Sequence, residues 1–183
     1  NTLAVASDTF SSINNLVKNN SAELTGSEWY QQISGSSAAG STAVTTDQYH
    51  TGYKSFYVNS TSSSGRVNYC QAFTGVPGTT YTLSAYTKLT ADTEGSGGVC
   101  LGFCYKDGTG VWKTVHGSYI TETQDWNRES YTFTLPSDAM GNMGIMLMVL
   151  DAEGTAYFDS VQLETGDVMN RYNLLENSGF QYN

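Results

Sequence analysis

Aromatic side chains are the most prominent residues in this sequence that could do chemistry with a ligand. The 183 residues include 13 tyrosines, seven phenylalanines and three tryptophans. An aromatic ring can stack on the apolar C–H face of a sugar, while planar polar side chains hydrogen-bond the sugar hydroxyl groups. Recognition of sugars is therefore one chemistry open to this chain. The rings considered for it are Trp29, Tyr30, Tyr69, Tyr86, Tyr105, Trp112, Tyr119 and Trp126.

Trp112 is the first choice for stacking, because it follows a glycine-rich turn at residues 106–110 and could project from the loop tip. The alternative is that Trp112 only clamps this hairpin against Tyr105. We place both residues at the predicted ligand face. Trp29 and Trp126, in contrast, are expected to be packed residues.

Four further residues are predicted as ligand contacts from their positions on predicted strands. Tyr86 shares a strand face with polar residues and is expected to be exposed. Tyr69 and Gln71 share one face of the preceding strand, and Asn68 lies on the other. Because a β-bulge would exchange these faces midway, all three are kept as polar or stacking contacts.

Catalytic residues are not recognisable in the sequence. Nucleophilic catalysis needs a serine or cysteine beside a histidine, and neither His50 nor His116 lies in a motif of that kind. Glycoside hydrolysis needs two opposed carboxylates, but the neighbouring Asp151 and Glu153 lie on a predicted turn and their spacing is uninformative. We expect no enzymatic activity.

The three cysteines show no zinc-binding pattern. On an extended strand, Cys100 and Cys104 would lie about 13 Å apart and could not form a disulfide with each other. Cys70 could pair with one of them across neighbouring strands. Buried free thiols are the preferred interpretation.

The charge of the chain argues against two classes of partner. The formal net charge is −9, the pI is about 4.4, and no cluster of lysine or arginine offsets the acidity. Such a field repels nucleic-acid phosphates and anionic lipid surfaces. No apolar run is long enough for a membrane span, and residues 1–20 do not have the pattern of a signal peptide.

Alternating apolar residues and frequent turn residues predict an all-β fold, with eight strands in a two-sheet antiparallel β-sandwich. In the predicted strand at 98–106, Val99, Leu101, Phe103 and Tyr105 alternate with the smaller residues Cys100, Gly102 and Cys104. The face that carries the smaller residues therefore offers a shallow floor. Residues 34–46 are expected to form a loop. The strands are predicted at 54–59, 66–74, 80–89, 98–106, 117–121, 127–135, 143–150 and 154–163.

A short internal repeat suggests how the chain is organised. Residues 15–20 read NLVKNN, and residues 173–178 read NLLENS. We therefore expect a connector at 1–14, one β-sandwich module at 15–170, and the truncated start of a following module at 171–183.

Four motifs occur together in order: NLVKNNSAE at 15–23, PGTTYTLSAY at 77–86, DW at 125–126 and AYFDSVQLE at 156–164. This order resembles the calcium-containing jelly-roll carbohydrate-binding modules of the galactose-binding-like fold. It is most similar to the modules found in tandem in large bacterial surface proteins with RHS-type tyrosine-aspartate repeats. The resemblance implies a secreted or cell-surface bacterial protein.

The same resemblance implies a structural calcium ion. By position, Glu23 and Asp159 would supply carboxylates, and Ser21 and Lys54 would supply main-chain carbonyl groups. Calcium takes six to eight oxygen ligands of these kinds. Without the resemblance, Glu23 would be read as a surface charge and Asp159 as a turn residue, and the second copy has Gln181 in place of Glu23.

These observations favour a non-catalytic carbohydrate-binding module, which binds a polysaccharide or glycan by aromatic stacking on one sheet face. The alternative is a structural spacer or adhesin module that contacts other proteins and binds no sugar. Fold transfers between relatives more readily than ligand specificity does, so both functions stay open here.

Overall fold

The computed structural model describes residues 15–24 and 28–169, which form nine β-strands and no helix. Within these ranges nothing is both helical and long enough to cross a membrane. Hairpin turns and short loops connect the strands. They are β1 (Tyr30–Ser34), β2 (Gly40–Thr45), β3 (Ser55–Ser60), β4 (Arg66–Thr74), β5 (Thr80–Leu89), β6 (Glu94–Lys106), β7 (Trp112–His116), β8 (Gln124–Thr134) and β9 (Asn142–Thr165).

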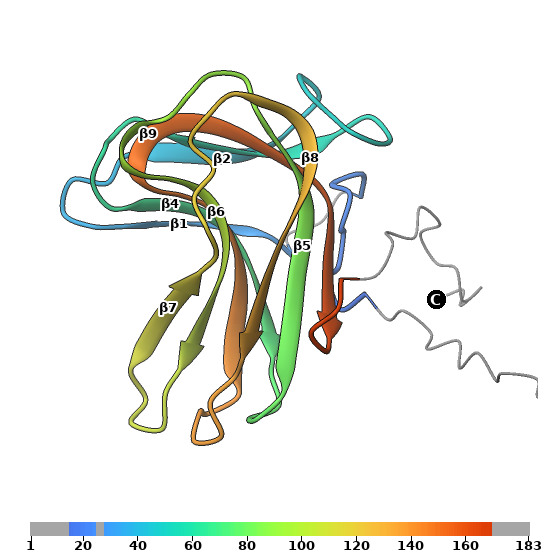
Figure 1. The fold of residues 1–183 in the computed structure, drawn as a ribbon, viewed down its shortest axis with the longest axis vertical. Coiled ribbons are helices and arrows are strands. Elements are labelled where there is room, and N and C mark those ends of the chain that lie inside the picture. Colours follow the sequence, from blue (N-terminus) through green and yellow to red (C-terminus); the bar gives the residue numbers. More distant parts are fainter. Residues whose placement is uncertain (1–14, 25–27, 170–183) are drawn as a thin grey trace, which may run out of the picture.

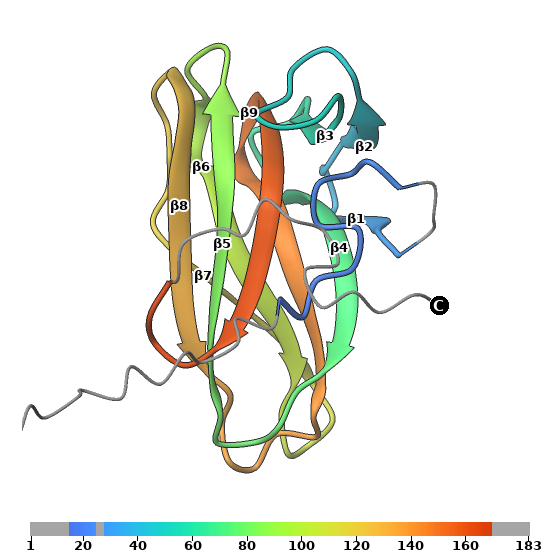
Figure 2. The ribbon, with the colours of Figure 1, turned by 90° about the vertical axis from the view of Figure 1, so that its right-hand side faces the viewer.

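Two antiparallel sheets share the long strand β9. Its first half pairs with β4 and β6, and the order of this sheet A is β1-β4-β9-β6-β7. Its second half pairs with β3 and β5, and the order of sheet B is β2-β3-β9-β5-β8. Figure 2 shows sheet B toward the viewer, with β9 lying beside β5. The prediction of an all-β antiparallel sandwich is confirmed.

The passage of β9 from one sheet to the other occurs at Asp151. This residue adopts a left-handed backbone conformation, with φ of 48°. Its N–H donates to the carbonyl oxygen of Gly65 at 2.7 Å, and its Oδ1 accepts from the N–H of the same glycine at 2.9 Å. The turn that precedes β4 therefore holds the bend in β9.

Apolar residues from both sheets form the core between them. Sheet A contributes Val99, Leu101 and Phe103 from β6, all nearly inaccessible to solvent, and sheet B contributes Leu83 and Phe158. Because side chains alternate across a strand, the intervening residues of β6 face outward. Figure 1 shows that sheet A is strongly curved, with its upper part turned toward the left, so that its outer face is concave.

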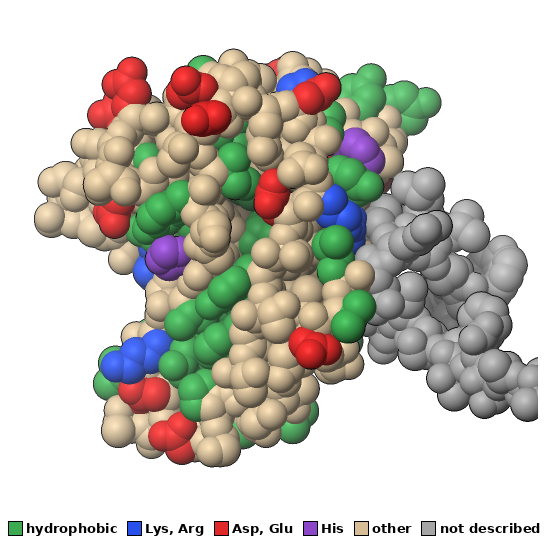
Figure 3. Space-filling model, viewed as in Figure 1, with side chains coloured by type: hydrophobic (Ala, Val, Ile, Leu, Met, Phe, Trp, Pro, Cys, Tyr) green, Lys and Arg blue, Asp and Glu red, His purple; other side chains and the backbone are tan. Residues whose placement is uncertain are grey.

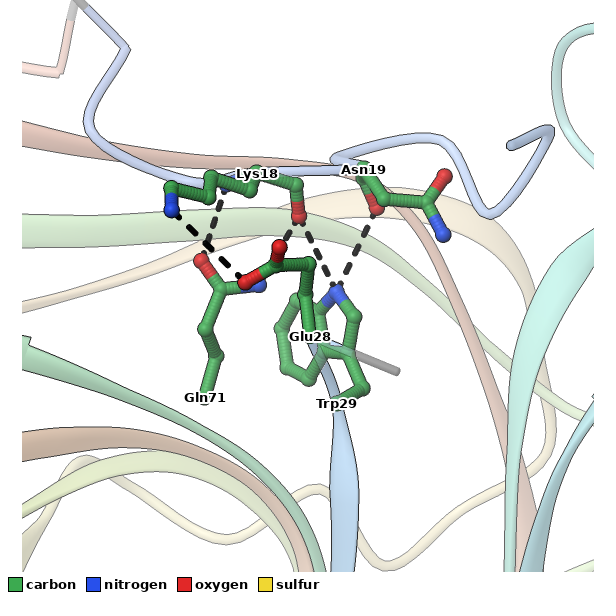
Figure 4. Close-up of polar contacts among 5 residues, drawn as sticks. All are labelled: Lys18, Asn19, Glu28, Trp29 and Gln71. Atoms are coloured by element: carbon green, nitrogen blue, oxygen red, sulfur yellow. Dashed lines mark hydrogen bonds and ion pairs between the residues drawn. The ribbon is translucent and has the colours of Figure 1, made fainter. Parts of the chain in front are cut away.

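The segment at residues 15–24 is anchored to both sheets. The N–H of Leu16 donates to the carbonyl oxygen of Leu163 in β9 at 2.9 Å. The Gln71 side chain accepts a hydrogen bond from the N–H of Lys18 and donates one to its carbonyl oxygen, both at 2.8 Å (Figure 4). The indole N–H of Trp29 donates to the carbonyl oxygens of Lys18 and Asn19. The expectation that Trp29 is packed is confirmed, since it is buried.

The predicted strand boundaries fall close to the structure for β4, β5 and β8. Three strands are missed: β1, which ends where a loop was expected at 34–46, β2, which lies wholly within that range, and β7. The strand predicted at 117–121 is also wrong: β7 ends at His116, and only an isolated bridge joins Ile120 to Val99. The two strands predicted at 143–150 and 154–163 are one continuous strand.

The predicted connector at 1–14 and the second copy of the repeat at 171–183 lie outside the described residues.

Candidate functional site

The outer face of sheet A has a floor of small and sulfur-containing side chains. Cys70, Cys100, Met146 and Met148 form a cluster on this face, and all four are buried. Register places them on β4, β6 and β9, which are neighbouring strands. Gly102 and Gly144 lie between them; a Cβ atom at Gly102 would come within 2.4 Å of the Met148 methyl group, so the floor leaves no room for a side chain there.

Exposed aromatic rings border this floor on both sides. Tyr30 of β1 is 45% exposed and lies on the β4 side. On the β7 side lie Trp112, which is 54% exposed, and Tyr119, which is 39% exposed and stacks on His116 at 5.1 Å between ring centroids. We call this concave face, with its floor and aromatic borders, the sheet A groove. In Figure 3 the outline of the molecule is hollowed on the left, between the upper end and the β6–β7 hairpin.

Arg66 crosses this groove. Its Nη1 donates to Thr114 Oγ1 at 2.7 Å, although Arg66 is on β4 and Thr114 is on β7. In a flat sheet, three strand spacings and six residues of register would separate these positions by roughly 25 Å. The contact is possible only because the sheet is curved.

Two polar atoms of the groove are buried without a hydrogen-bond partner among the described residues. They are Arg66 Nε and Asn68 Oδ1, from neighbouring outward positions of β4. The Asn68 Nδ2 donates to Gln32 Oε1 at 3.3 Å, which fixes the amide so that its oxygen is left without a partner. Such atoms cost free energy unless a water or a ligand satisfies them. Similar buried atoms without a partner among the described residues belong to His50, Thr87 and Gln162 on the other side of the molecule.

The position of Trp112 is set by the turn that precedes it. Asp107 Oδ1 accepts from the Thr109 N–H and hydroxyl and from the Val111 N–H, at 2.7–2.9 Å. The hydrogen bonds from Thr109 and Val111 lower the pKa of Asp107 to about 2, so the turn keeps this carboxylate ionised in moderately acidic solution. Lys106 Nζ lies 5.6 Å from the centre of the Trp112 ring.

The three cysteines are free thiols in this structure. β4 and β6 both pair with β9 and not with each other, so Cys70 lies about two strand spacings, or roughly 10 Å, from the cysteines of β6. That separation is too large for a disulfide. Burial raises the pKa of Cys70 and of Cys100 to about 12, which keeps both protonated at neutral pH.

Only some of the predicted ligand residues lie in the sheet A groove. Trp112 and Asn68 do, on outward positions of β7 and β4. Tyr86 lies on the other sheet, where the His50 ring stacks on it at 3.7 Å and the Arg128 guanidinium lies 5.2 Å from its centre. Tyr86 is partly buried by these neighbours and lies outside the sheet A groove, so its role in stacking on a sugar stays a prediction.

Tyr105, Tyr69 and Gln71 face inward and lie outside the sheet A groove, so their contacts with a glycan stay a prediction. Tyr105 packs on the core with its ring 5.3 Å from Phe133, and Tyr69 packs against Trp29 at 5.8 Å. The amide of Gln71 is occupied by the main chain of Lys18.

The two carboxylates predicted to bind calcium lie against one loop. Asp159 Oδ2 accepts from the N–H groups of His50 and Thr51, both at 2.8 Å. Glu23 Oε1 accepts from the N–H groups of Tyr53 and Lys54 at 2.6 and 2.8 Å. Burial raises the pKa of Asp159, whereas the N–H groups act in the opposite direction.

Carboxylate oxygens are among the ligands that a hard divalent cation such as calcium takes. Among the described residues, no lysine or arginine forms an ion pair with Glu23 or Asp159. Both oxygens of Asp159 already accept two hydrogen bonds each, Oδ2 from the loop N–H groups and Oδ1 from the Ser160 N–H and hydroxyl, so Glu23 Oε2 is the carboxylate oxygen that accepts none from a described residue. No group of three His, Cys, Asp or Glu side chains meets in the described ranges. A calcium ion would therefore depend on main-chain carbonyl groups as well, for which Ser21 and Lys54 were predicted.

Sequence reasoning missed most of the groove. Tyr30 and Tyr119 were in the pool of aromatic residues but were not selected, while Arg66, Gln32 and His116 were assigned no binding role. The alternation that placed Cys100 and Cys104 on one face also places Lys106 there, and it would have found the floor of the neighbouring strands by the same reasoning.

The curved antiparallel sandwich and the groove on its concave sheet define a jelly-roll binding domain. Residues 14–143 match the family described as "carbohydrate binding domain", and the chain belongs to this family. Predicted membership of a carbohydrate-binding jelly-roll family is thus confirmed.

Solved structures of such modules share the fold. The family 22 carbohydrate-binding module of Clostridium thermocellum Xyn10B has a TM-score of 0.63 and 19% identity, over 82% of this chain and 94% of that one. The "family 16 carbohydrate binding module-2" has a TM-score of 0.53 and 23% identity, over 81% of this chain and 99% of that one.

Two curated relatives from Bacillus subtilis are similar over 96% of this chain. They are the "tRNA(Glu)-specific nuclease WapA" of subsp. natto strain BEST195, at 31% identity, and the "tRNA nuclease WapA" of strain 168, at 32% identity. This chain spans 8% of the length of each, so it corresponds to a small part of those proteins.

Proposed function

We propose that this domain binds a glycan in the sheet A groove and carries out no catalysis. The observation that supports this most strongly is the pair of buried, unpartnered polar atoms, Arg66 Nε and Asn68 Oδ1, between exposed aromatic rings. Sugar hydroxyl groups can both donate and accept, so they would satisfy this donor and this acceptor together. Membership of a carbohydrate-binding family supports the same conclusion.

Stacking would come from the borders of the groove. Trp112, Tyr30 and Tyr119 present rings to solvent on opposite sides of the floor. A pyranose lying on one of these rings would place its hydroxyl groups over the floor, where Gln32 and Thr114 add polar atoms beside Arg66.

A wider context is part of this proposal. We infer that the domain belongs to a secreted or cell-surface bacterial protein, next to other modules of the same chain, and that calcium bound by Glu23, Asp159 and the carbonyl groups of Ser21 and Lys54 braces its fold. The convergence of both carboxylates on the loop at residues 50–54 supports the metal. When bound, calcium would neutralise these charges and join the first residues of the domain to β9.

The test of glycan binding is an array of plant, host and bacterial glycans, probed with the purified chain in calcium buffer. We expect binding that falls at least ten-fold in Trp112→Ala and in Tyr30→Ala, because each removes a stacking ring. Trp126→Ala is the matched control, since Trp126 lies against His50 on the other sheet, 5.9 Å between rings.

Two outcomes would contradict the proposal. Binding that survives both groove variants would place the sugar elsewhere on the domain. If the native chain binds no glycan on the array, the alternative of a spacer or adhesin module that contacts protein would be favoured.

A further inference from the structure

The sheet A groove differs in charge from the rest of this acidic protein. The chain as a whole carries a net charge of −9, yet none of the outward-facing strand positions named below holds a carboxylate. The exposed pair Glu94 and Glu153 lies at the far end of the β6–β9 ladder, beyond Gly98. Two of the outward positions are cationic, Arg66 and Lys106. The outward positions are 30, 32 and 34 on β1; 66, 68, 70, 72 and 74 on β4; 144, 146, 148 and 150 on β9; 98, 100, 102, 104 and 106 on β6; and 112, 114 and 116 on β7.

The outer face of sheet B shows the opposite pattern. It carries the buried acids Asp159 and Glu164 on β9. Its Lys88 is neutralised by Asp125, with 2.9 Å between Nζ and Oδ1. Sheet B also carries Arg128 on β8, over the Tyr86 ring, so the difference between the two faces lies in the buried acids of sheet B.

The two cations converge on the same part of the groove. The Arg66 guanidinium donates a hydrogen bond to Thr114 on β7. Two residues earlier on the same strand, the Trp112 ring contacts the ammonium group of Lys106. Outward positions two residues apart on a strand are about 7 Å apart. One ligand group beside Trp112 could thus contact both charges.

Arg66 forms no ion pair with any described carboxylate. Asp151, the acid nearest to it in register, is engaged by the main chain of Gly65. A sugar hydroxyl could accept a hydrogen bond from the buried Nε but would leave the positive charge unmatched. Carboxylate and phosphate oxygens form charge-assisted bonds with a guanidinium that are roughly twice as strong as neutral ones, and they can bind it through two parallel bonds.

From these charges we propose that the ligand of the groove is an acidic glycan, whose carboxylate or phosphate group binds between Arg66 and Lys106. This inference rests on the proposed function, because it specifies the class of sugar bound at the same site. Electrostatic complementarity then makes the groove selective within a protein whose overall charge repels polyanions.

Matched pairs of polymers test the inference. Polygalacturonate and its fully methyl-esterified form differ in carboxylate charge on one backbone, and phosphomannan and its dephosphorylated form differ in phosphate. Binding of the native chain to each, measured by calorimetry at 50 mM and 500 mM salt, is combined with an array that contains acidic and neutral glycans. We expect at least ten-fold preference for an acidic ligand and a loss of affinity in high salt. Preference within the polygalacturonate pair would identify a carboxylate as the bound group, and preference within the phosphomannan pair would identify a phosphate.

The variants assign this preference to the groove. Arg66→Gln should abolish the preference for acid, while Arg66→Lys should keep part of it, because lysine retains the charge but not the Nε donor. Lys106→Gln should weaken the preference for an acidic ligand several-fold. Lys88→Gln, which removes a positive charge from sheet B, is the control and should leave it unchanged; thermal melting confirms that each variant is folded.

The outcomes separate the two proposals. Preference for neutral glycans, or equal binding within the matched pairs without salt dependence, would overturn the acidic ligand and leave glycan binding intact. Acidic preference that persists in Arg66→Gln would also overturn it. Absence of binding to every glycan would overturn both.

Discussion

Among single residues, the cysteines of the sheet A groove are predicted to differ in reactivity. Cys70 and Cys100 are buried and their pKa is about 12, whereas Cys104 is partly exposed. Because the thiolate is the nucleophile, iodoacetamide at pH 8 should alkylate Cys104 first and leave the other two unmodified in the folded chain. Labelling followed by peptide mass spectrometry measures this order.

Unfolding in guanidinium provides the control for that experiment, since all three thiols should then react at similar rates. Raising the pH should accelerate labelling of Cys70 and Cys100 steadily, because the thiolate fraction of a thiol with a pKa of about 12 grows with each unit of pH below that value. Fast modification of either at pH 8 would show that the floor of the groove is open to solvent.

Strict alternation predicts more of the groove than the residues initially selected. It places Tyr105 with Val99, Leu101 and Phe103, and Tyr69 with Val67, so both rings belong to the core. They were selected because they are aromatic, against the pattern of their own strands. The role of Arg66 was beyond sequence reasoning, because its contact with Thr114 depends on curvature and not on spacing.

Among the elements, strands with buried faces were predictable and polar edge strands were not. β4 and β5 carry a regular apolar alternation, and their boundaries were predicted to the residue. β1 and β2 read YQQIS and GSTAVT and are mostly exposed, so their strand conformation comes from pairing with β4 and β3. Pairing of this kind leaves little trace in a single sequence.

The bend of β9 yields a prediction about stability. Asp151→Val should lower the free energy of unfolding by about 2–4 kcal/mol, because it places a β-branched residue at φ of 48° and removes the hydrogen bond to Gly65. Asp151→Asn tolerates the left-handed conformation and should cost less than about 1 kcal/mol. Urea denaturation followed by fluorescence gives these differences.

Asp151→Gly separates the two contributions, since glycine accepts the conformation without strain but lacks the carboxylate. It should fall between the other variants. Equal stability of the valine and asparagine variants would mean that the bend does not depend on this residue.

For the whole molecule, calcium is predicted to raise the melting temperature. At a calcium concentration 100 times the Kd, ligand linkage contributes about 2.7 kcal/mol, or roughly 5–10 °C for a domain of this size. Chelation should remove this increment without loss of β-structure. Differential scanning calorimetry with and without calcium measures it.

Variants connect that increment to the loop at residues 50–54. Glu23→Gln and Asp159→Asn should reduce the difference between the calcium and chelator melts, whereas Glu122→Ala, an exposed acid, should preserve it. The difference is the informative quantity, because loss of the hydrogen bonds to the loop lowers the melting temperature in either condition. Identical melts of the native chain with and without calcium would rule out the site.

The fold class and family were predictable from motif order and alternation, but the shape of the binding face was not. Curvature arises from the joint twist and bending of five strands and from the shared strand β9, and no local pattern records it.

The attachment of Leu16 to Leu163 has a mechanical consequence. The first and last described residues lie on the same side of the molecule (Figure 1), next to the second half of β9. Tension applied between these two ends would load the hydrogen bonds of residues 15–16 with β9 in sheet B. The sheet A groove lies outside that direct load path, so a ligand could stay bound while the chain on either side is under strain.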